Sequence, residues 1–310
     1  MKAVLFEKHG GPEVLHLAEV PDPIAGPGEV VVDIHAASVN AADYKVRLGG
    51  GNYSTSGVRL PHILGRDFSG AVSAVGDGVT DLKVGDVVFG VCDQGVEGAY
   101  AEKIAIKAAI IAKKPARLGH AEAAAMALTS LTALWALEDT AKLKPGETIL
   151  IQGGAGGVAG FAIQLSKSLA ATVVTTASAR NHDYVKSLGA DRAIDYSAQD
   201  FTKAAGPCDV VFDTVGGEVQ IRSYEVLKPG GRLVWIASAP AGFQPGRTDV
   251  EVLRPDVKRD RAHLERMLVL YDKGAVWPPK IERYTLTDAA AAHRVSEGRH
   301  LQGKLVLIVR

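Results

Sequence analysis

The sequence contains little cysteine, no surplus of charge of either sign and no long apolar run. Cys92 and Cys208 are its only cysteines, too few for a disulfide framework or a four-thiolate zinc site. Lysine and arginine together number 35, as do aspartate and glutamate, so no basic excess is available to neutralise nucleic-acid phosphates. No apolar run approaches the roughly 18 residues that a membrane span needs. We therefore expect no nucleic-acid partner and no membrane-spanning segment.

The remaining bulk properties are those of an ordinary globular protein. Hydrophobic residues make up 47% and charged residues 23% of the chain, and its 310 residues suggest two domains of roughly 150 residues each. Residues 1–8 have a strand-like pattern and lack the apolar core and small-residue cleavage site of a secretory signal. We expect a cytoplasmic protein in which both cysteines are small buried hydrophobes.

Turns rich in glycine and proline divide the first third of the chain into short apolar runs. Residues 30–36, 69–75 and 86–90 are such runs and predict strands. Near the end of the chain, residues 284–286 lead into an alanine-rich helix, and residues 304–309 predict a last strand. Because the two regions share this pattern, we expect the tail to pack on an irregular, mostly β N-terminal domain.

The middle of the chain alternates between helices and apolar strands. Helices are predicted at residues 122–142, 157–169 and 183–188, and strands at residues 148–151, 171–176, 193–196, 209–213 and 232–236. Uninterrupted β-branched strands separated by helices are typical of a doubly wound parallel sheet that is buried on both faces. Further on, the charged run 254–266 mixes both signs and predicts an exposed helix face.

A glycine-rich loop follows the first strand of this alternating region. Residues 152–160 read QGGAGGVAG, and Gly154, Gly156 and Ala159 fit the G-x-G-x-x-A spacing. Glycines at these places let the backbone approach a pyrophosphate, whose charge is met by free N–H groups where the next helix begins. The position between a strand and a helix makes the motif specific for a dinucleotide. The alternative interpretation is a tight turn without a ligand.

The end of the second strand carries the signal for cofactor choice. An acidic residue about twenty positions after the loop would bind the ribose hydroxyls of NAD, but no acid occurs before Asp183. Ser178 and Arg180 stand there instead, and hydroxyl and guanidinium groups bind a 2′-phosphate that a carboxylate would repel. The sequence therefore favours NADPH. Helix capping by Ser178 and Asn181 is the alternative role for these residues.

Together with this loop, a series of motifs resembles a known family. The chain is similar to the zinc-independent members of the medium-chain dehydrogenase/reductase superfamily, in the quinone oxidoreductase branch. The resemblance covers nearly the whole chain. It rests on the loop at residues 152–160 and on motifs at residues 38–45, 63–70, 84–90, 98–102, 131–133, 188–191, 213–217, 228–231 and 303–306.

The resemblance implies an α/β protein with two domains. Residues 1–121 and 275–310 would form an N-terminal GroES-like catalytic domain, and residues 122–274 a Rossmann NADP-binding domain. The implied activity is hydride transfer between NADPH and a quinone or an α,β-unsaturated carbonyl acceptor, a small molecule. The resemblance also implies a homodimer that pairs through the edge of the Rossmann sheet, near residues 233–236.

The same resemblance bears on metal content. The zinc alcohol dehydrogenases of the superfamily carry a cysteine where Asn40 stands here, and a His-Glu pair where this chain has Arg66 and Asp67. Zinc acts as the Lewis acid that lets those enzymes deprotonate an alcohol. We therefore expect no metal site and no simple alcohol oxidation.

The resemblance implies the following site residues. The catalytic candidates are Asn40, Lys45 and Tyr53. The cofactor-binding candidates are Asn40, Thr132, Gly153, Gly156, Gly157, Val158, Ser178, Arg180, Tyr196, Val215, Ala237 and Ser238. Three of these residues have a structural alternative: Asn40 could be a turn residue, Tyr196 an amphipathic surface tyrosine, and Tyr53 a loop residue that covers apolar surface. As a functional residue, Tyr53 would be the proton donor or orienter found in enoyl-thioester reductases of the superfamily.

Two other functions stay open at this point. The first is a 2-enoyl-thioester reductase, which needs a basic patch and a long channel for its acyl carrier. The second is an NADPH-binding scaffold or stress protein with little turnover, because a glycine loop supports cofactor binding without demonstrating catalysis.

Overall fold

The computed structural model describes residues 1–49, 58–93, 95–96 and 98–310, and Tyr53 lies outside these ranges. The described chain divides into two compact units. Unit 1 comprises residues 1–128, 259–266 and 278–310, and unit 2 comprises residues 129–258 and 267–277. Two segments, α2 (His120–Leu134) and α7 (Arg261–Asp272), pass from one unit to the other. The functional domain boundaries given above stay a prediction.

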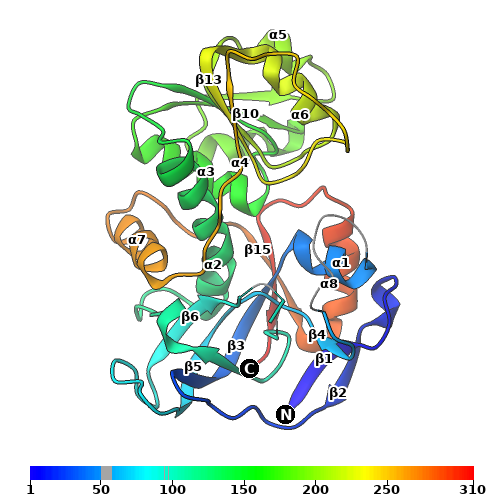
Figure 1. The fold of residues 1–310 in the computed structure, drawn as a ribbon, viewed down its shortest axis with the longest axis vertical. Helices are drawn as coiled ribbons and strands as arrows, with labels where there is room; N and C mark the ends of the chain where they lie inside the picture. The colour runs from blue at the N-terminus through cyan, green and yellow to red at the C-terminus, as the bar shows by residue number, and fades with distance from the viewer. Residues whose placement is uncertain (50–57, 94, 97) are drawn as a thin grey trace. The chain divides into compact units, whose positions relative to one another are not determined.

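Unit 1 is built on strand pairs that are antiparallel, apart from the parallel pair β15 and β16 (Figure 1). Its larger sheet has the path β15-β16-β3-β5-β6-β8, with β7 also paired to β3, and its smaller sheet has the order β2-β1-β4. Two further helices, α1 (Ala41–Leu48) and α8 (Ala289–Glu297), belong to this unit. The strands are β1 (Lys2–Phe6), β2 (His16–Glu19), β3 (Glu29–Val39), β4 (His62–Ile63), β5 (Asp67–Val75), β6 (Val87–Val91), β7 (Lys103–Lys107), β8 (Ile111–Lys113), β15 (Ile281–Thr285) and β16 (Lys304–Ile308).

The C-terminal tail is an integral part of this sheet. Strand β16 pairs with β3 in antiparallel register, with Leu307 opposite Ala37, and with β15 in parallel register. Figure 1 shows β3 in blue beside the red C-terminal segment. The prediction that the tail packs on the N-terminal domain is confirmed.

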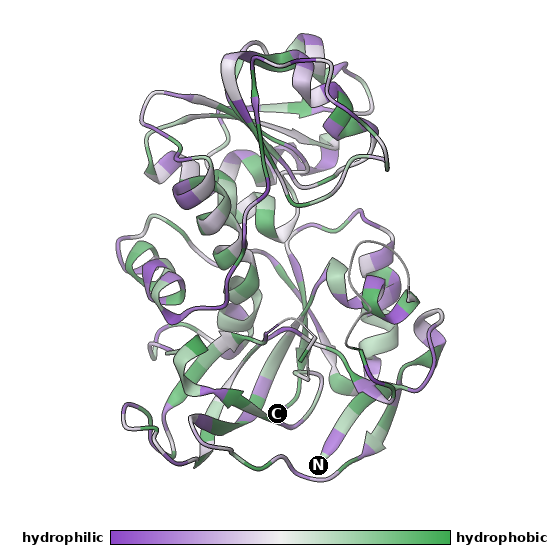
Figure 2. Ribbon diagram, in the orientation of Figure 1, coloured by the Kyte–Doolittle hydropathy of each residue, from purple (hydrophilic) through white to green (hydrophobic). Residues whose placement is uncertain are grey.

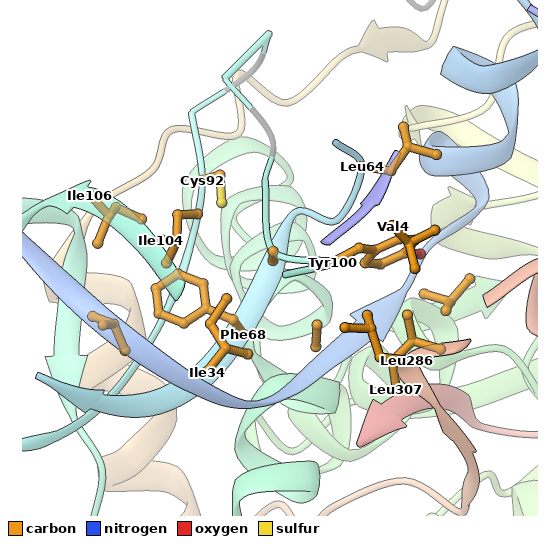
Figure 3. Packing of buried hydrophobic residues seen from close by; sticks show 14 of the residues in the cluster. Val4, Ile34, Leu64, Phe68, Cys92, Tyr100, Ile104, Ile106, Leu286 and Leu307 are labelled. Carbon is orange, nitrogen blue, oxygen red and sulfur yellow. The ribbon is translucent and has the colours of Figure 1, made fainter. Parts of the chain in front are cut away.

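A large apolar cluster fills much of the interior of unit 1. Figure 3 shows Ile34, Phe68 and Ile104 at one end of the cluster, and Leu286 and Leu307 at the other. These side chains come from the beginning, the middle and the end of the chain. Their burial therefore fixes the tail to the N-terminal strands through the hydrophobic effect as well as through backbone hydrogen bonds.

Unit 2 contains a six-stranded sheet with the order β11-β10-β9-β12-β13-β14, and every neighbouring pair is parallel. This order confirms the doubly wound prediction, because the chain leaves β9 first toward β10 and β11 and then returns to β12 on the other side. The strands are β9 (Thr148–Ile151), β10 (Thr172–Ala177), β11 (Arg192–Asp195), β12 (Cys208–Asp213), β13 (Leu227–Trp235) and β14 (Glu251–Leu253). The helices are α3 (Gly157–Ser168), α4 (His182–Ser187), α5 (Phe201–Ala204) and α6 (Glu218–Ser223).

The hydropathy pattern explains these elements. Figure 2 shows hydrophobic residues along the strands and along α2, and hydrophilic residues mainly in turns and on outward helix faces. In β9, Ile149, Leu150 and Ile151 are all fully buried, as expected for a central strand that is covered on both faces.

Both cysteines are buried, as predicted. Among the described residues, no helix combines the length and the hydropathy needed to cross a bilayer.

The prediction for the charged run 254–266 is correct only in part. The run is not one helix, but four of its charged residues are exposed, namely Arg254, Asp256, Lys258 and Glu265. Its helix begins only at Arg261, and two of its arginines are bound inward within unit 1. Arg259 Nε donates to the carbonyl oxygen of Cys92 at 3.1 Å, and Arg261 Nε donates to that of Ile111 at 2.7 Å. A guanidinium group presents several donors in a fixed fork and can serve backbone carbonyls. Mixed charge along the sequence therefore does not identify a continuous exposed helix face here.

The fold predicts unequal costs for two truncations in the unit 2 sheet. Leu150→Ala removes a fully buried side chain from the central strand and should lower the free energy of unfolding by about 2–5 kcal/mol. Val252 lies in the edge strand β14, and its side chain is 42% exposed. Val252→Ala should therefore change the free energy of unfolding by less than about 0.5 kcal/mol. Urea unfolding followed by far-UV circular dichroism measures both. Equal losses would contradict the burial of β9.

Candidate functional site

The glycine loop lies where the strand order of the unit 2 sheet reverses. It follows the carboxyl end of β9, between the ends of β10 and β12. Gly153 has a φ of 75°, a conformation that favours glycine. Its N–H donates to Thr176 Oγ1 at 3.0 Å, and the N–H of Gly154 donates to the carbonyl oxygen of Thr176 at 2.9 Å. The loop is thereby fixed to β10 at the position where doubly wound sheets bind ligands.

Two glycines of the loop are needed for different reasons. A Cβ on Gly154 would lie 2.2 Å from Thr175 Oγ1, so packing within the protein requires glycine there. A Cβ on Gly156 would meet only the carbonyl oxygen of Gly153, at the ordinary distance of 3.5 Å, and Gly156 has an unstrained φ of −76°. Folding therefore does not demand glycine at 156. A ligand that approaches the backbone where α3 begins would demand it.

Asp213 organises the adjacent turn, a role that the sequence analysis missed. This fully buried carboxylate at the end of β12 accepts hydrogen bonds from the backbone N–H groups of Val215 at 2.9 Å and Gly216 at 3.0 Å. Burial raises the pKa of Asp213 to about 6, against the lowering effect of these donors. The N–H of Gly217 donates to Ser238 O at 3.0 Å, so the turn joins the segment that follows β13. Val215 and Ser238 are both exposed beside this turn.

The candidates for the 2′-phosphate lie at the ends of two neighbouring strands. Ala177 of β10 pairs with Asp195 of β11, so Ser178 and Tyr196 follow paired positions. Ser178 Oγ accepts a hydrogen bond from Asn181 at 3.1 Å, whereas Arg180 is exposed and Tyr196 is 51% exposed.

One acid near these strand ends was overlooked in the sequence. Asp195 closes β11, and its Oδ1 accepts hydrogen bonds from the backbone N–H and the hydroxyl of Ser197. These bonds lower the pKa of Asp195. Its charge is thus held by a local turn at the end of the strand. Thr132, also in unit 2, is only 8% exposed.

In unit 1, Asn40 lies within a buried polar cluster. Its Nδ2 donates to Asp67 Oδ1 at 2.8 Å, and its Oδ1 accepts from Lys304 Nζ at 2.7 Å. Asp67 is fully buried and Lys304 is 4% exposed. The Asn40 side chain also makes a longer contact, 3.4 Å from Nδ2 to Ser38 O. Asn40 is also the N-cap residue of α1, where its backbone N–H donates to Asp43 Oδ2 at 2.8 Å, so a structural role stands beside the proposed functional one.

Asp43 extends the cluster from helix α1. Its Oδ2 accepts from the backbone N–H of Asn40 at 2.8 Å and from the Tyr100 hydroxyl at 3.0 Å, and its Oδ1 lies 3.7 Å from Arg66 Nε. Burial raises the pKa of Asp43 to about 6, although Arg66 lowers it. Neither Asp43 nor Arg66 was a candidate for these contacts from sequence, because their partners are far apart along the chain.

A buried histidine completes the far side of the cluster. Arg47 can only donate, so its Nη1, 3.1 Å from His293 Nδ1, defines that nitrogen as an acceptor. Nε2 of the neutral ring then donates to the Tyr100 hydroxyl, 3.2 Å away. Burial and the nearby Arg47 charge lower the pKa of His293 to about 3. Arg47 also forms an ion pair with Glu297.

The other unit 1 candidates have less defined surroundings. Lys45 is half-buried in α1, and burial together with the charge of Arg299 lowers its pKa. Tyr53 lies outside the described residues. In the described part of the chain, no three side chains from His, Cys, Asp and Glu are grouped as a metal site would require.

Comparison with known proteins identifies the family. Residues 26–116 match the family described as alcohol dehydrogenase GroES-like domain, and residues 188–307 match the family described as zinc-binding dehydrogenase. The chain is 33% identical to the NADPH-dependent alkenal/one oxidoreductase of Arabidopsis thaliana chloroplasts, over 99% of this chain and 79% of that protein. It therefore belongs to the medium-chain dehydrogenase/reductase superfamily, in the quinone oxidoreductase branch.

Solved structures agree with this assignment. The quinone oxidoreductase of Coxiella burnetii superimposes with a TM-score of 0.93 at 36% identity, over 100% of this chain and 99% of that one. The NADPH complex of the Escherichia coli quinone oxidoreductase gives a TM-score of 0.87 at 29% identity, over the whole of both chains. The predicted GroES-like and Rossmann domains and the predicted family are confirmed.

Some relatives are longer than this chain. The 2-methylene-furan-3-one reductase of Solanum lycopersicum is 38% identical over 79% of this chain, and the match covers 64% of that protein. A mycocerosic acid synthase-like polyketide synthase of Mycobacterium tuberculosis is 32% identical over 92% of this chain, and the match covers only 14% of that protein. The chain thus spans less than two thirds of these two relatives.

The loop geometry predicts different outcomes for the same substitution at two glycines. Gly154→Ala places a methyl group against Thr175 and should lower the free energy of unfolding of the protein without cofactor by about 1–3 kcal/mol. Gly156→Ala, in contrast, should leave that stability nearly unchanged and weaken NADPH binding by about tenfold or more, because the added Cβ obstructs a pyrophosphate. Thermal unfolding and fluorescence titration with NADPH test the pair. Unchanged NADPH affinity in Gly156→Ala would contradict a pyrophosphate site at this loop.

Proposed function

We propose that this protein is an NADPH-dependent reductase that delivers a hydride to a quinone or an α,β-unsaturated carbonyl compound without zinc. The observation that carries the proposal is the set formed by Asn40, Asp67 and Lys304. The Asn40 amide, hydrogen-bonded to a carboxylate and an ammonium group, stands where zinc-dependent relatives place a cysteine thiolate. Such a set can orient a conjugated carbonyl but cannot act as the Lewis acid for alcohol oxidation. Quinones and enones accept hydride without that help.

We propose the following roles for the candidate residues. The glycine loop and the first turn of α3 would bind the pyrophosphate, with Gly153, Gly156, Gly157 and Val158 in contact with it. NADPH, when bound, supplies the hydride. Val215, Ala237, Ser238 and Thr132 are proposed as further cofactor contacts.

On the substrate side, Asn40 and Lys45 are proposed to lie near the reacting carbonyl. An enone that accepts a hydride must also gain a proton, and Tyr53 is the proposed donor. A quinone acceptor has a weaker need for such a donor, because water can protonate its reduced oxygens. Reduction of an enone therefore depends on a proton donor in the protein, whereas reduction of a quinone does not.

A second candidate function is supported by the comparison with polyketide synthases. The chain matches a short part of a polyketide synthase and is similar in fold to an enoyl reductase, and both relationships support a 2-enoyl-thioester reductase. That substrate also needs hydride at a β-carbon and a proton at the α-carbon, so it makes the same chemical demands as an enone. The scaffold alternative predicts cofactor binding with little turnover.

Activity on a small panel of acceptors decides among these functions. With saturating NADPH, we expect turnover of a quinone or an enone, slower turnover of a crotonyl thioester, and no oxidation of a simple alcohol with NADP. Elemental analysis of protein purified without chelator should find far less than one zinc per chain. Faster reduction of the thioester would favour the second function, and binding of NADPH without turnover of any acceptor would favour the scaffold. One zinc per chain, with activity that a chelator abolishes, would refute the zinc-free chemistry.

The preference for NADPH is assigned to Ser178, Arg180 and Tyr196 at the ends of β10 and β11. Arg180→Ala should weaken NADPH binding by about 1.5–3 kcal/mol, the value of a charge-assisted hydrogen bond, and leave NADH binding nearly unchanged. Dissociation constants for both cofactors, measured on the parent protein and the variant, test this assignment. Equal losses for NADPH and NADH would show that Arg180 does not contact the 2′-phosphate.

We further propose that the protein acts in the cytoplasm as a homodimer. In support, β14 is the last strand of the unit 2 sheet, and Val252 at its centre is exposed. An open strand edge of this kind can pair with a second copy of the chain.

A further inference from the structure

Lys304 is the most deeply buried of the lysines that the structure describes, and the function proposed above counts it in the Asn40 set without giving its ammonium group a task of its own. It stands at the first position of β16, is 4% exposed, and donates from Nζ to Val39 O at 2.8 Å and to Asn40 Oδ1 at 2.7 Å. Burying an ammonium group is costly unless its hydrogens are satisfied and its charge is balanced. A lysine kept here at that cost therefore calls for an explanation.

The negative charge that balances Lys304 is reached through the amide of Asn40. The carbonyl oxygen of the amide faces the ammonium group, and its nitrogen donates to the carboxylate of Asp67 at 2.8 Å. We call Lys304, Asn40 and Asp67 the amide bridge. Both hydrogen bonds of the bridge are charge-assisted, which makes them stronger than bonds between neutral groups.

The bridge allows one orientation of the amide. A flipped Asn40 would turn its NH2 group toward an ammonium group, which can only donate, and its oxygen toward a carboxylate, which can only accept. Two favourable contacts would become two repulsive ones. The charges at both ends therefore determine the direction of the Asn40 dipole.

The bridge also leaves part of the amide available to a ligand. Of the two hydrogens on Asn40 Nδ2, one is directed to Asp67 and the other makes only the 3.4 Å contact with Ser38 O. Asn40 is itself only partly buried, unlike Lys304 and Asp67. Polarisation of the amide by the ammonium group on its oxygen makes that second hydrogen a better donor.

We propose that Lys304 is a positioning residue, whose ammonium group fixes and polarises the Asn40 amide so that its outer N–H is directed at the substrate carbonyl. This inference deepens the proposed function and rests on it. Positioning matters for rate because a small misplacement of an orienting group far from the chemistry can cost a large factor in turnover.

Lys114 offers a matched control in the same unit. Its ammonium group is also partly buried and donates to the backbone carbonyl oxygens of Pro115 and Leu118, and burial lowers its pKa, as it does that of Lys304. Neither of these two hydrogen bonds of Lys114 involves a residue of the amide bridge. Substitution of either lysine by methionine therefore removes a desolvated ammonium group with two carbonyl acceptors, but only one substitution affects Asn40.

The test compares Lys304→Met and Lys114→Met with the parent protein, each saturated with NADPH. Lys304→Met should lower kcat on an enone by about tenfold to 100-fold, with the NADPH dissociation constant within about twofold of the parent value, whereas Lys114→Met should keep kcat. Lys304→Gln, which retains a neutral donor, should lie between the parent and Lys304→Met. If Lys304→Met does not fold, Lys304→Gln takes its place in the comparison.

A second readout is independent of activity. The side-chain NH2 resonances of Asn40, assigned by their loss in Asn40→Ala, should shift and exchange faster with solvent in Lys304→Met but not in Lys114→Met. Parent-like resonances in Lys304→Met, or equal kcat losses in the two methionine variants, overturn the proposal. If the parent protein reduces none of the acceptors, the proposed function fails separately, and the resonances alone decide whether Lys304 fixes the amide.

Discussion

The carboxylate of Asp67 is the group on which the arrangement of unit 1 depends. It is fully buried at the start of β5 and accepts hydrogen bonds from the Ser38 hydroxyl, the Asn40 amide and the backbone N–H of Leu128. These donors come from the end of β3, the residue before α1 and the interior of α2. A buried charge cannot be left without partners, so the three segments must meet at this point for the unit to fold.

The surrounding charges follow from that constraint. Three buried or nearly buried cations, Lys304, Arg66 and Arg47, accompany the acids Asp67, Asp43 and Glu297. Each cation is held through an amide, an ion pair or both. Such clusters contribute less to stability than well-packed apolar side chains of the same volume would. Their retention at the proposed substrate side is consistent with a requirement for a defined polar geometry, which is the basis of the roles given to Asn40 and Lys304.

In unit 2, the loops of the proposed cofactor site are held mainly through backbone groups. There, a carboxylate, Asp213, also organises the local structure, but its partners are N–H groups of the turn that follows it. The glycine loop is hydrogen-bonded to Thr176 of β10. Both the glycine loop and the turn after β12 are therefore held by hydrogen bonds to the strand ends at the reversal of strand order. This arrangement leaves the first turn of α3 to present its N–H groups, which is the general means by which doubly wound sheets bind anions.

The sequence by itself determined the fold class, the alternation of strands and helices in the middle of the chain and the position of the glycine loop. It did not predict the helices α1, α5 and α6 or the edge strand β14. The features that it did predict depend on local periodicity and on residue types with special backbone conformations, which are readable one segment at a time. The family followed from motifs along the chain. Sequence could also recognise that Asn40 replaces a zinc ligand, because that inference compares residue types at matched places.

Only the tertiary structure decided what surrounds Asn40. Lys304 is 264 residues away from it along the chain, and the register of β16 on β3 brings the two together. No periodicity encodes such a contact. The inward arginines of the run 254–266 were misjudged for the same reason, since their acceptors are carbonyl groups of distant segments. Similarly, glycine at 154 and at 156 looks alike in sequence, and only the 2.2 Å approach of Thr175 separates a packing requirement from a ligand requirement.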